Sequence, residues 1–135
     1  MTETVYKFVR VDECGLLHSP LAAGRWQLLY ELDHCTTPRC AASQLFAFRS
    51  RGDALESWSG DPVEQRVRLY EAAASACQNA PAWMPLAADE NNWHEYWLWF
   101  QRGMPRGLRN SSWKLYQPCE SLVLCRDITL IRCVW

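Results

Sequence analysis

The segment Asp89–Met104 carries more aromatic side chains than any other stretch of comparable length in the chain. On a helix of 3.6 residues per turn, one face would hold Trp93, Tyr96, Trp97, Phe100 and Met104. A strand is the alternative, because aromatic residues also alternate along the segment. We favour the helix, since the segment has no β-branched residue, Asp89 is a suitable N-cap and Pro105 follows directly.

An aromatic face of this size must be buried against another apolar layer, and alternating segments elsewhere predict a β-sheet. The expected strands are Thr4–Val11, Arg25–Leu32, Leu45–Arg49, Gln65–Ala73, Leu122–Cys125 and Ile128–Trp135. Thr4–Val11 is apolar on both sides and should lie centrally, while Gln65–Ala73 also fits a helix. Ser50 and Asp53 predict a helix from Arg51 to Trp58. The sequence therefore predicts one α+β domain over residues 1–135, a mostly antiparallel sheet with two helices packed on it.

Charge and cysteine content limit the compartment and the partners. The net charge of -1 argues against a partner held by overall electrostatics, such as duplex DNA or an anionic membrane. The N-terminal residues lack the pattern of a signal peptide, and the longest uncharged run contains prolines and amides. We therefore expect a cytoplasmic protein without membrane attachment, whose seven cysteines are reduced thiols.

Catalytic and metal-binding motifs are weak in this sequence. His34, Cys35 and Cys40 are potential zinc ligands, but they supply one pair where a structural site needs two. We expect an ordinary loop there, with no metal and no cofactor. A cysteine paired with His18, His34 or His94 could act as a nucleophile, but such pairs are available in most cysteine-rich chains, so whether the chain is an enzyme stays open.

Binding residues are suggested by exposed aromatics and by two windows without acidic side chains. Trp99 lies off the predicted aromatic face and could anchor a protein interface. The windows 96–119 and 34–52 contain arginines near aromatic residues, a combination that suits phosphates and stacked bases. The expected binding residues are Trp99, Arg102, Arg106, Arg109, Trp113, Arg39 and Arg49. The alternative is a solvated loop whose charges interact weakly.

Short motifs resemble known groups of proteins. Tyr6–Arg10, Trp26 to Tyr30, Leu45–Phe48 with Ala54, and Cys119–Ser121 with Ile128–Arg132 are similar to segments of small proteins from phages, bacteria and fungi. The unit from Leu45 to Trp58 resembles a strand–helix element of ADP-ribosyltransferase-like folds, which implies nucleotide or NAD binding but matches no catalytic residue of that family here.

Two functions therefore remain open at the level of sequence. The first is a non-catalytic protein-interaction module that binds a protein partner or a second copy of the chain. The second is a nucleotide- or NAD-binding protein related to ADP-ribosyltransferase-like folds, in an intact or a degenerate form, that could also accept single-stranded nucleic acid.

Overall fold

A computed structural model describes residues 2–20, 27–39, 43–58, 60–80, 84–85, 97, 115–116 and 119–135. Its helices are α1 (Arg51–Ser57) and α2 (Pro62–Gln65). The strands of the large sheet are β1 (Thr2–Val11), β2 (Leu17–His18), β3 (Leu29–Tyr30), β4 (Cys35–Thr36), β5 (Leu45–Phe48), β6 (Val67–Ser75), β7 (Gln78–Asn79), β10 (Leu122–Cys125) and β11 (Asp127–Cys133). A separate ladder joins β8 (Met84–Pro85) to β9 (Leu115–Tyr116).

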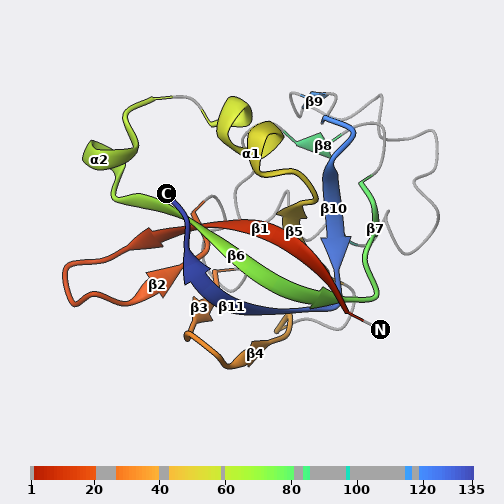
Figure 1. The fold of residues 1–135 in the computed structure, drawn as a ribbon, viewed down its shortest axis with the longest axis horizontal. Helices are drawn as coiled ribbons and strands as arrows, with labels where there is room; N and C mark the ends of the chain where they lie inside the picture. The colour runs from red at the N-terminus through yellow and green to blue at the C-terminus, as the bar shows by residue number, and fades with distance from the viewer. Residues whose placement is uncertain are drawn as a thin grey trace.

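The large sheet is organised around β1, and all of its described pairings are antiparallel (Figure 1). Its strands follow the order β4-β11-β6-β1-β5-β10-β7. One edge of β1 is fully paired with β6 from Thr2 to Arg10. The other edge divides into two branches, because Tyr6 pairs with β5 while Arg10 and Val11 pair with β2, which in turn pairs with β3. The sheet therefore forks along β1 between residues 6 and 10.

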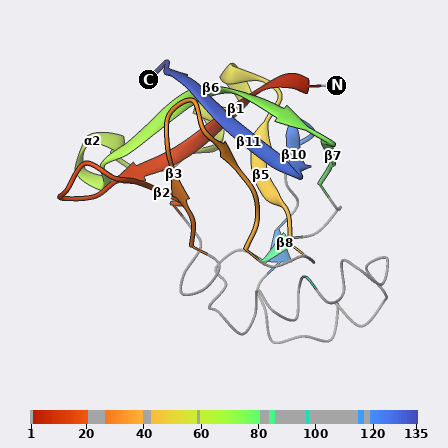
Figure 2. The same ribbon diagram turned by 90° about the horizontal axis from the view of Figure 1, so that it is seen from below.

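Two apolar clusters lie on opposite faces of β1, as alternation along a strand requires. The larger core contains Val5 and Val9 of β1 together with side chains from most other strands: Leu28, Tyr30, Leu45, Ala47, Tyr70, Ala72, Ala74, Val123, Cys125, Ile128 and Leu130. The smaller core is built on Phe8 and Leu69 and is covered by Ala54 and Leu55 of α1. Figure 2 shows the curvature of the strands that enclose the larger core.

Local signals explain where the two helices begin. The Ser50 side chain accepts a hydrogen bond from the backbone N–H of Asp53, which is a normal N-cap for α1. Asp61 caps α2 in the same way, and Pro62 occupies the first turn, where a missing N–H costs nothing. Arg66 ends α2 in the left-handed conformation, and its N–H reaches back to the last turn.

The structure confirms the predicted fold class, a mostly antiparallel sheet with two helices packed on it. The central position of β1 is confirmed, and the segment after Gln65 is a strand rather than a helix. Of the aromatic segment, only Trp97 is described: it has helical conformation, is 3% exposed, and its ring lies 5.6 Å from that of Phe46. The second described helix is α2, not the predicted aromatic helix, whose other residues lie outside the described ones.

Several short strands are not among the strands expected from the sequence. These are β2, β4, β7, β8 and β9, each only two residues long. The strand predicted over Arg25–Leu32 is limited to Leu29–Tyr30 among the described residues. A strand of two residues is too short to show an alternating pattern in the sequence. Its pairing depends instead on where the neighbouring strand lies in space.

Candidate functional site

Two of the seven predicted binding residues, Arg39 and Arg49, belong to the described part of the chain. Trp99, Arg102, Arg106, Arg109 and Trp113 lie outside the described residues. Arg39 and Arg49 are described and exposed, Arg39 beyond β4 and Arg49 directly after β5. Nothing in the described geometry joins these two arginines into one site, and their binding role stays a prediction.

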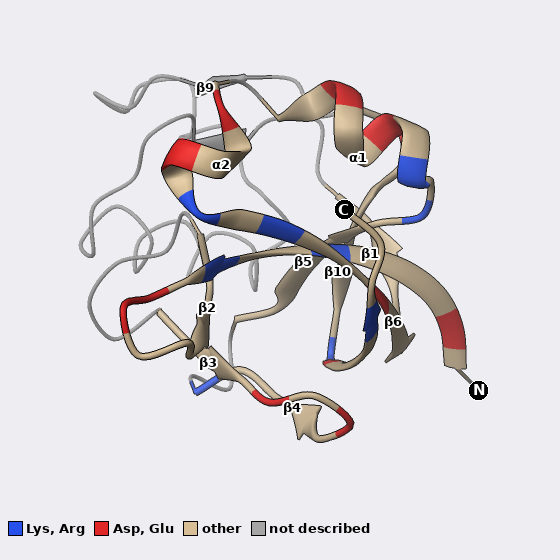
Figure 3. Cartoon of the chain, turned by 60° about the vertical axis from the view of Figure 1, so that its left-hand side comes forward, with Lys and Arg blue, Asp and Glu red and all other residues tan. Residues whose placement is uncertain are grey.

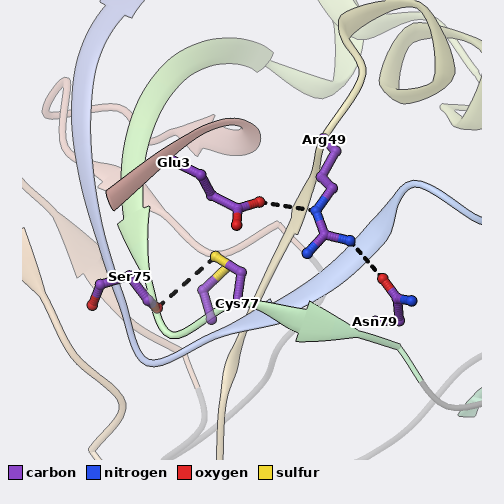
Figure 4. A network of polar contacts seen from close by, with 6 residues as sticks. Glu3, Arg49, Ser75, Cys77 and Asn79 are labelled. Atoms are coloured by element: carbon purple, nitrogen blue, oxygen red, sulfur yellow. Dashed lines mark hydrogen bonds and ion pairs between the residues drawn. The ribbon is translucent and has the colours of Figure 1, made fainter. Parts of the chain in front are cut away.

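Arg49 is held in a polar network at the N-terminal end of β1 (Figure 4). Its Nε donates to Oε1 of Glu3 at 2.9 Å, and its Nη1 donates to Oδ1 of Asn79. The hydrogen bond to Glu3 raises the pKa of Arg49, so the guanidinium stays charged. These bonds join β1, β5 and β7, and a phosphate at Arg49 would have to compete with Glu3. Among the described residues, Arg49 therefore has a structural role that the charge pattern alone did not indicate.

The turn that joins β1 to β2 is fixed by Asp12. One carboxylate oxygen, Oδ1, accepts hydrogen bonds from the backbone N–H groups of Cys14 and Leu16. The other, Oδ2, accepts a hydrogen bond from Nε2 of His18. The bond from His18 and then the bond from Leu16 lower the pKa of Asp12. Gly15 at φ 82° supplies the left-handed residue that completes the turn.

Beside this turn lies an outward-facing surface that combines two leucines with two polar side chains; it is here named the hairpin surface and is defined by Arg10, Leu16, His18 and Leu29. In the ladder, Arg10 lies opposite His18, and His18 lies opposite Leu29, so the three side chains form a row across β1, β2 and β3. Leu16 and His18 flank Leu17, which packs on the larger core, so both lie on the opposite face. Leu16 is 51% exposed and Leu29 is 52% exposed.

Charged residues lie both within and around the hairpin surface. Glu13 and Glu31 are exposed close to it, and Arg10 belongs to it. Figure 3 shows acidic residues at the β1–β2 turn and on both helices, and basic residues along β1 and β6. An apolar centre with a charged rim is the usual composition of a protein interface. The sequence prediction missed this surface because no strand was expected at Leu17–His18.

Lys7 is the second feature that the sequence prediction did not identify. It lies between Val5 and Val9 on the face of β1 that forms the larger core, and it is only 6% exposed. Its Nζ donates to the backbone oxygen of Phe46 at 2.7 Å and lies 5.6 Å from the centre of the Tyr30 ring. Lys7 therefore bridges the fork between the β5 branch and the β2–β3 branch of the sheet.

Burial shifts the pKa values of both Lys7 and Tyr30. Desolvation lowers the pKa of Lys7 from 10.5 to about 8, since a buried ammonium loses its hydration. Burial also raises the pKa of Tyr30, an effect that the neighbouring Ser19 side chain reduces. The Tyr30 hydroxyl nevertheless has no partner in good hydrogen-bond geometry among the described residues. The burial of Lys7 could have been predicted from the sequence, because alternation along a central strand places its side chain between those of Val5 and Val9 on one face.

The described residues contain neither a cluster of metal ligands nor a membrane-spanning helix. Within the described ranges, no group of three or more histidine, cysteine or acidic side chains could hold a metal ion. His34 contacts the backbone oxygen of Leu32, Cys35 belongs to β4, and Cys40 lies outside the described residues. No helix in the described part of the chain has the length and apolar character needed to span a bilayer.

Comparison with known proteins adds no relative. No protein-family model matches the chain, and no curated protein or solved structure matches it.

Proposed function

We propose that this chain is a protein-interaction module that binds a protein partner, or a second copy of itself, through the hairpin surface. The observation that supports this proposal is the pair of leucines, Leu16 and Leu29, which are half exposed beside a tightly held turn. Isolated exposed leucines are common on soluble proteins. These two differ because they lie on one face of adjacent strands with charged residues around them.

Rigidity strengthens the proposal. Asp12 accepts three hydrogen bonds, from Cys14, Leu16 and His18, and these fix the turn before any partner arrives. Ser19 extends the same order to β3, because its N–H donates to the Leu28 oxygen and its hydroxyl accepts from the Leu28 N–H. A surface that is already ordered loses little conformational entropy on binding, so more of its contact energy becomes affinity.

The proposal is tested with two charge substitutions on the hairpin surface, Leu16→Lys and Leu29→Lys. Sedimentation velocity over a hundredfold range of protein concentration reports self-association, and affinity purification from cells that express tagged chain reports other partners. We expect each substitution to weaken whichever association the unmodified chain shows by at least tenfold, because burying an unpaired ammonium in an interface costs several kcal/mol.

Val63→Lys is the matched control. Val63 lies on α2, is 84% exposed and is outside the hairpin surface, so it tests whether any exposed apolar residue has the same effect. Its substitution should leave association unchanged. Association that survives both hairpin substitutions, with melting temperatures unchanged, would contradict the proposal.

A further inference from the structure

Two bent stretches of chain run side by side through a corner of the sheet. Residues 123 and 124 pair with 79 and 78 in the β10–β7 ladder, and residues 127 and 128 pair with 75 and 74 in the β11–β6 ladder. Both ladders have the same antiparallel register, so they are two parts of one ladder that bends between them. The N–H of Arg126 donates to the Ser75 oxygen at the bend. By this register, Cys125 lies directly opposite Cys77.

The contact between the two sulfur atoms agrees with that register. Sγ of Cys77 lies 2.8 Å from Sγ of Cys125, which is closer than two unbonded sulfur atoms normally approach. Residues opposite each other in an antiparallel pair have Cα atoms about 4.5–5.5 Å apart, within the range that a disulfide spans. Both thiols are free, Cys125 buried in the larger core and Cys77 half-buried.

Neighbouring contacts hold the two cysteines at this position. Ala76, between Ser75 and Cys77, has φ 50°, a left-handed conformation that a non-glycine residue adopts only when its surroundings require it. The Ser75 hydroxyl donates to Asp127 across the bend. On the other side, Asn79 is bonded to Arg49 (Figure 4). The backbone therefore presents Cys77 to Cys125 without rearrangement.

We propose that Cys77 and Cys125 form a modification site, at which a peroxide converts the two thiols into an intramolecular disulfide. Cys77 is the more exposed thiol, so its sulfur attacks a peroxide oxygen; the O–O bond breaks, water leaves and Cys77 becomes a sulfenic acid. The Cys125 sulfur then attacks the Cys77 sulfur, an S–S bond forms, and the sulfenic oxygen leaves as a second water with the Cys125 proton. Two thiols lose two electrons, and one peroxide becomes two water molecules.

The environment of the thiols sets the rate of this reaction. Burial raises the pKa of both Cys77 and Cys125, so little thiolate is present at neutral pH. The Arg49 guanidinium opposes this rise at Cys77. We therefore expect slow oxidation, over minutes to hours in excess hydrogen peroxide, and faster reaction as the pH rises. Once formed, the bond is protected by the same burial.

The experiment treats the reduced full-length chain with hydrogen peroxide at low protein concentration, alkylates the remaining thiols in denaturant and maps tryptic peptides without reduction. Cleavage at arginine and lysine leaves Cys77 alone in the peptide 69–102, whereas Cys125 shares the peptide 115–126 with Cys119. We expect these two peptides to be joined, with a mass lower by two hydrogen atoms than their sum. Dithiothreitol should separate them again.

Three variants decide which sulfurs are joined. Cys119→Ser should retain the cross-linked product, while Cys77→Ser and Cys125→Ala should each lose it. The oxidised chain should also melt at a higher temperature than the reduced chain, and this difference should disappear in Cys77→Ser. The proposal is overturned if the cross-link persists in Cys125→Ala, or if Cys77 and Cys125 are both recovered as alkylated thiols after the exposed cysteines have been oxidised.

Discussion

Lys7 provides the sharpest test of the structure, because a buried ammonium makes stability depend on pH in a direction that can be worked out beforehand. The amine has a pKa of about 8 in the folded chain, and its ordinary value is 10.5. Below pH 8 both folded and unfolded chains carry the charge, and folding bears the full cost of burying it. Between pH 8 and 10.5 the unfolded chain binds more protons than the folded one, so stability from this group rises with pH.

The magnitude follows from the size of the shift. One pKa unit corresponds to about 1.4 kcal/mol, so the full shift of Lys7 changes the free energy of unfolding by about 3 kcal/mol. Most of this change occurs between pH 7 and pH 10. The substitution Lys7→Met keeps most of the side-chain volume and removes the titrating group. It also removes the hydrogen bond from Lys7 to the Phe46 oxygen, which costs about 1–3 kcal/mol at every pH. The informative quantity is therefore the pH dependence of the difference between the two proteins.

Urea unfolding at pH 7, 8, 9 and 10 under reducing conditions measures this difference. We expect the free energy of unfolding of the unmodified chain to rise by about 2–3 kcal/mol relative to Lys7→Met over this range. Arg10→Gln is the control, because it removes an exposed cation from the same strand. A flat difference for Lys7→Met would refute the burial of a charged amine, and a falling difference would require a carboxylate next to Lys7.

Three further predictions concern the turn, the aromatic segment and the nucleotide alternative. Asp12→Ala should lower the melting temperature at neutral pH, and this decrease should be smaller in acid. The reason is that the hydrogen bonds that lower the pKa of Asp12 stabilise the fold only while its carboxylate is charged. Thermal unfolding of the variant and the unmodified chain at pH 7 and at pH 3 measures both decreases. Trp97→Ala should cost about 3–5 kcal/mol in urea unfolding, since Trp97 is buried against Phe46, and an unchanged stability would show that Trp97 is not part of the core. NAD, ADP-ribose, ATP and short oligonucleotides should each be tested by thermal shift: a specific ligand stabilises the fold by about 2.7 kcal/mol at a hundredfold excess over its dissociation constant, and no shift with any of them would eliminate nucleotide binding.

The long elements could be predicted from the sequence, because their signals are local. β1 alternates apolar residues over ten positions, and Ser50 with Asp53 marks the start of α1. The segment that forms β6 was less clear, because its apolar spacing also fits a helix. α2 was missed although Asp61 and Pro62 are ordinary start signals, because the same residues also read as the end of α1. Four residues are too few for periodicity to decide between these interpretations.

The candidate sites depended on spatial relations that no local pattern contains. Leu16 and Leu29 lie on one face only because β2 pairs with β3, and Cys77 and Cys125 are 48 positions apart in sequence. Arg49 was predicted as a phosphate ligand from its neighbours in sequence, yet its described partners are Glu3 and Asn79. Lys7 is the exception, because its burial could have been inferred from strand alternation and the central position of β1.

The position of β6 between β1 and β11 has a consequence for how the chain folds during synthesis. β1 is made first, but its long ladder cannot form until residues 67–75 have left the ribosome, and the other edge of β6 stays open until residues 127–133 follow. Contacts across such sequence separations make folding slow, on a scale of milliseconds to seconds. During translation, apolar strand edges on β1 and β6 are therefore available to chaperones, and to neighbouring nascent chains, for longer than in a helical protein of similar length.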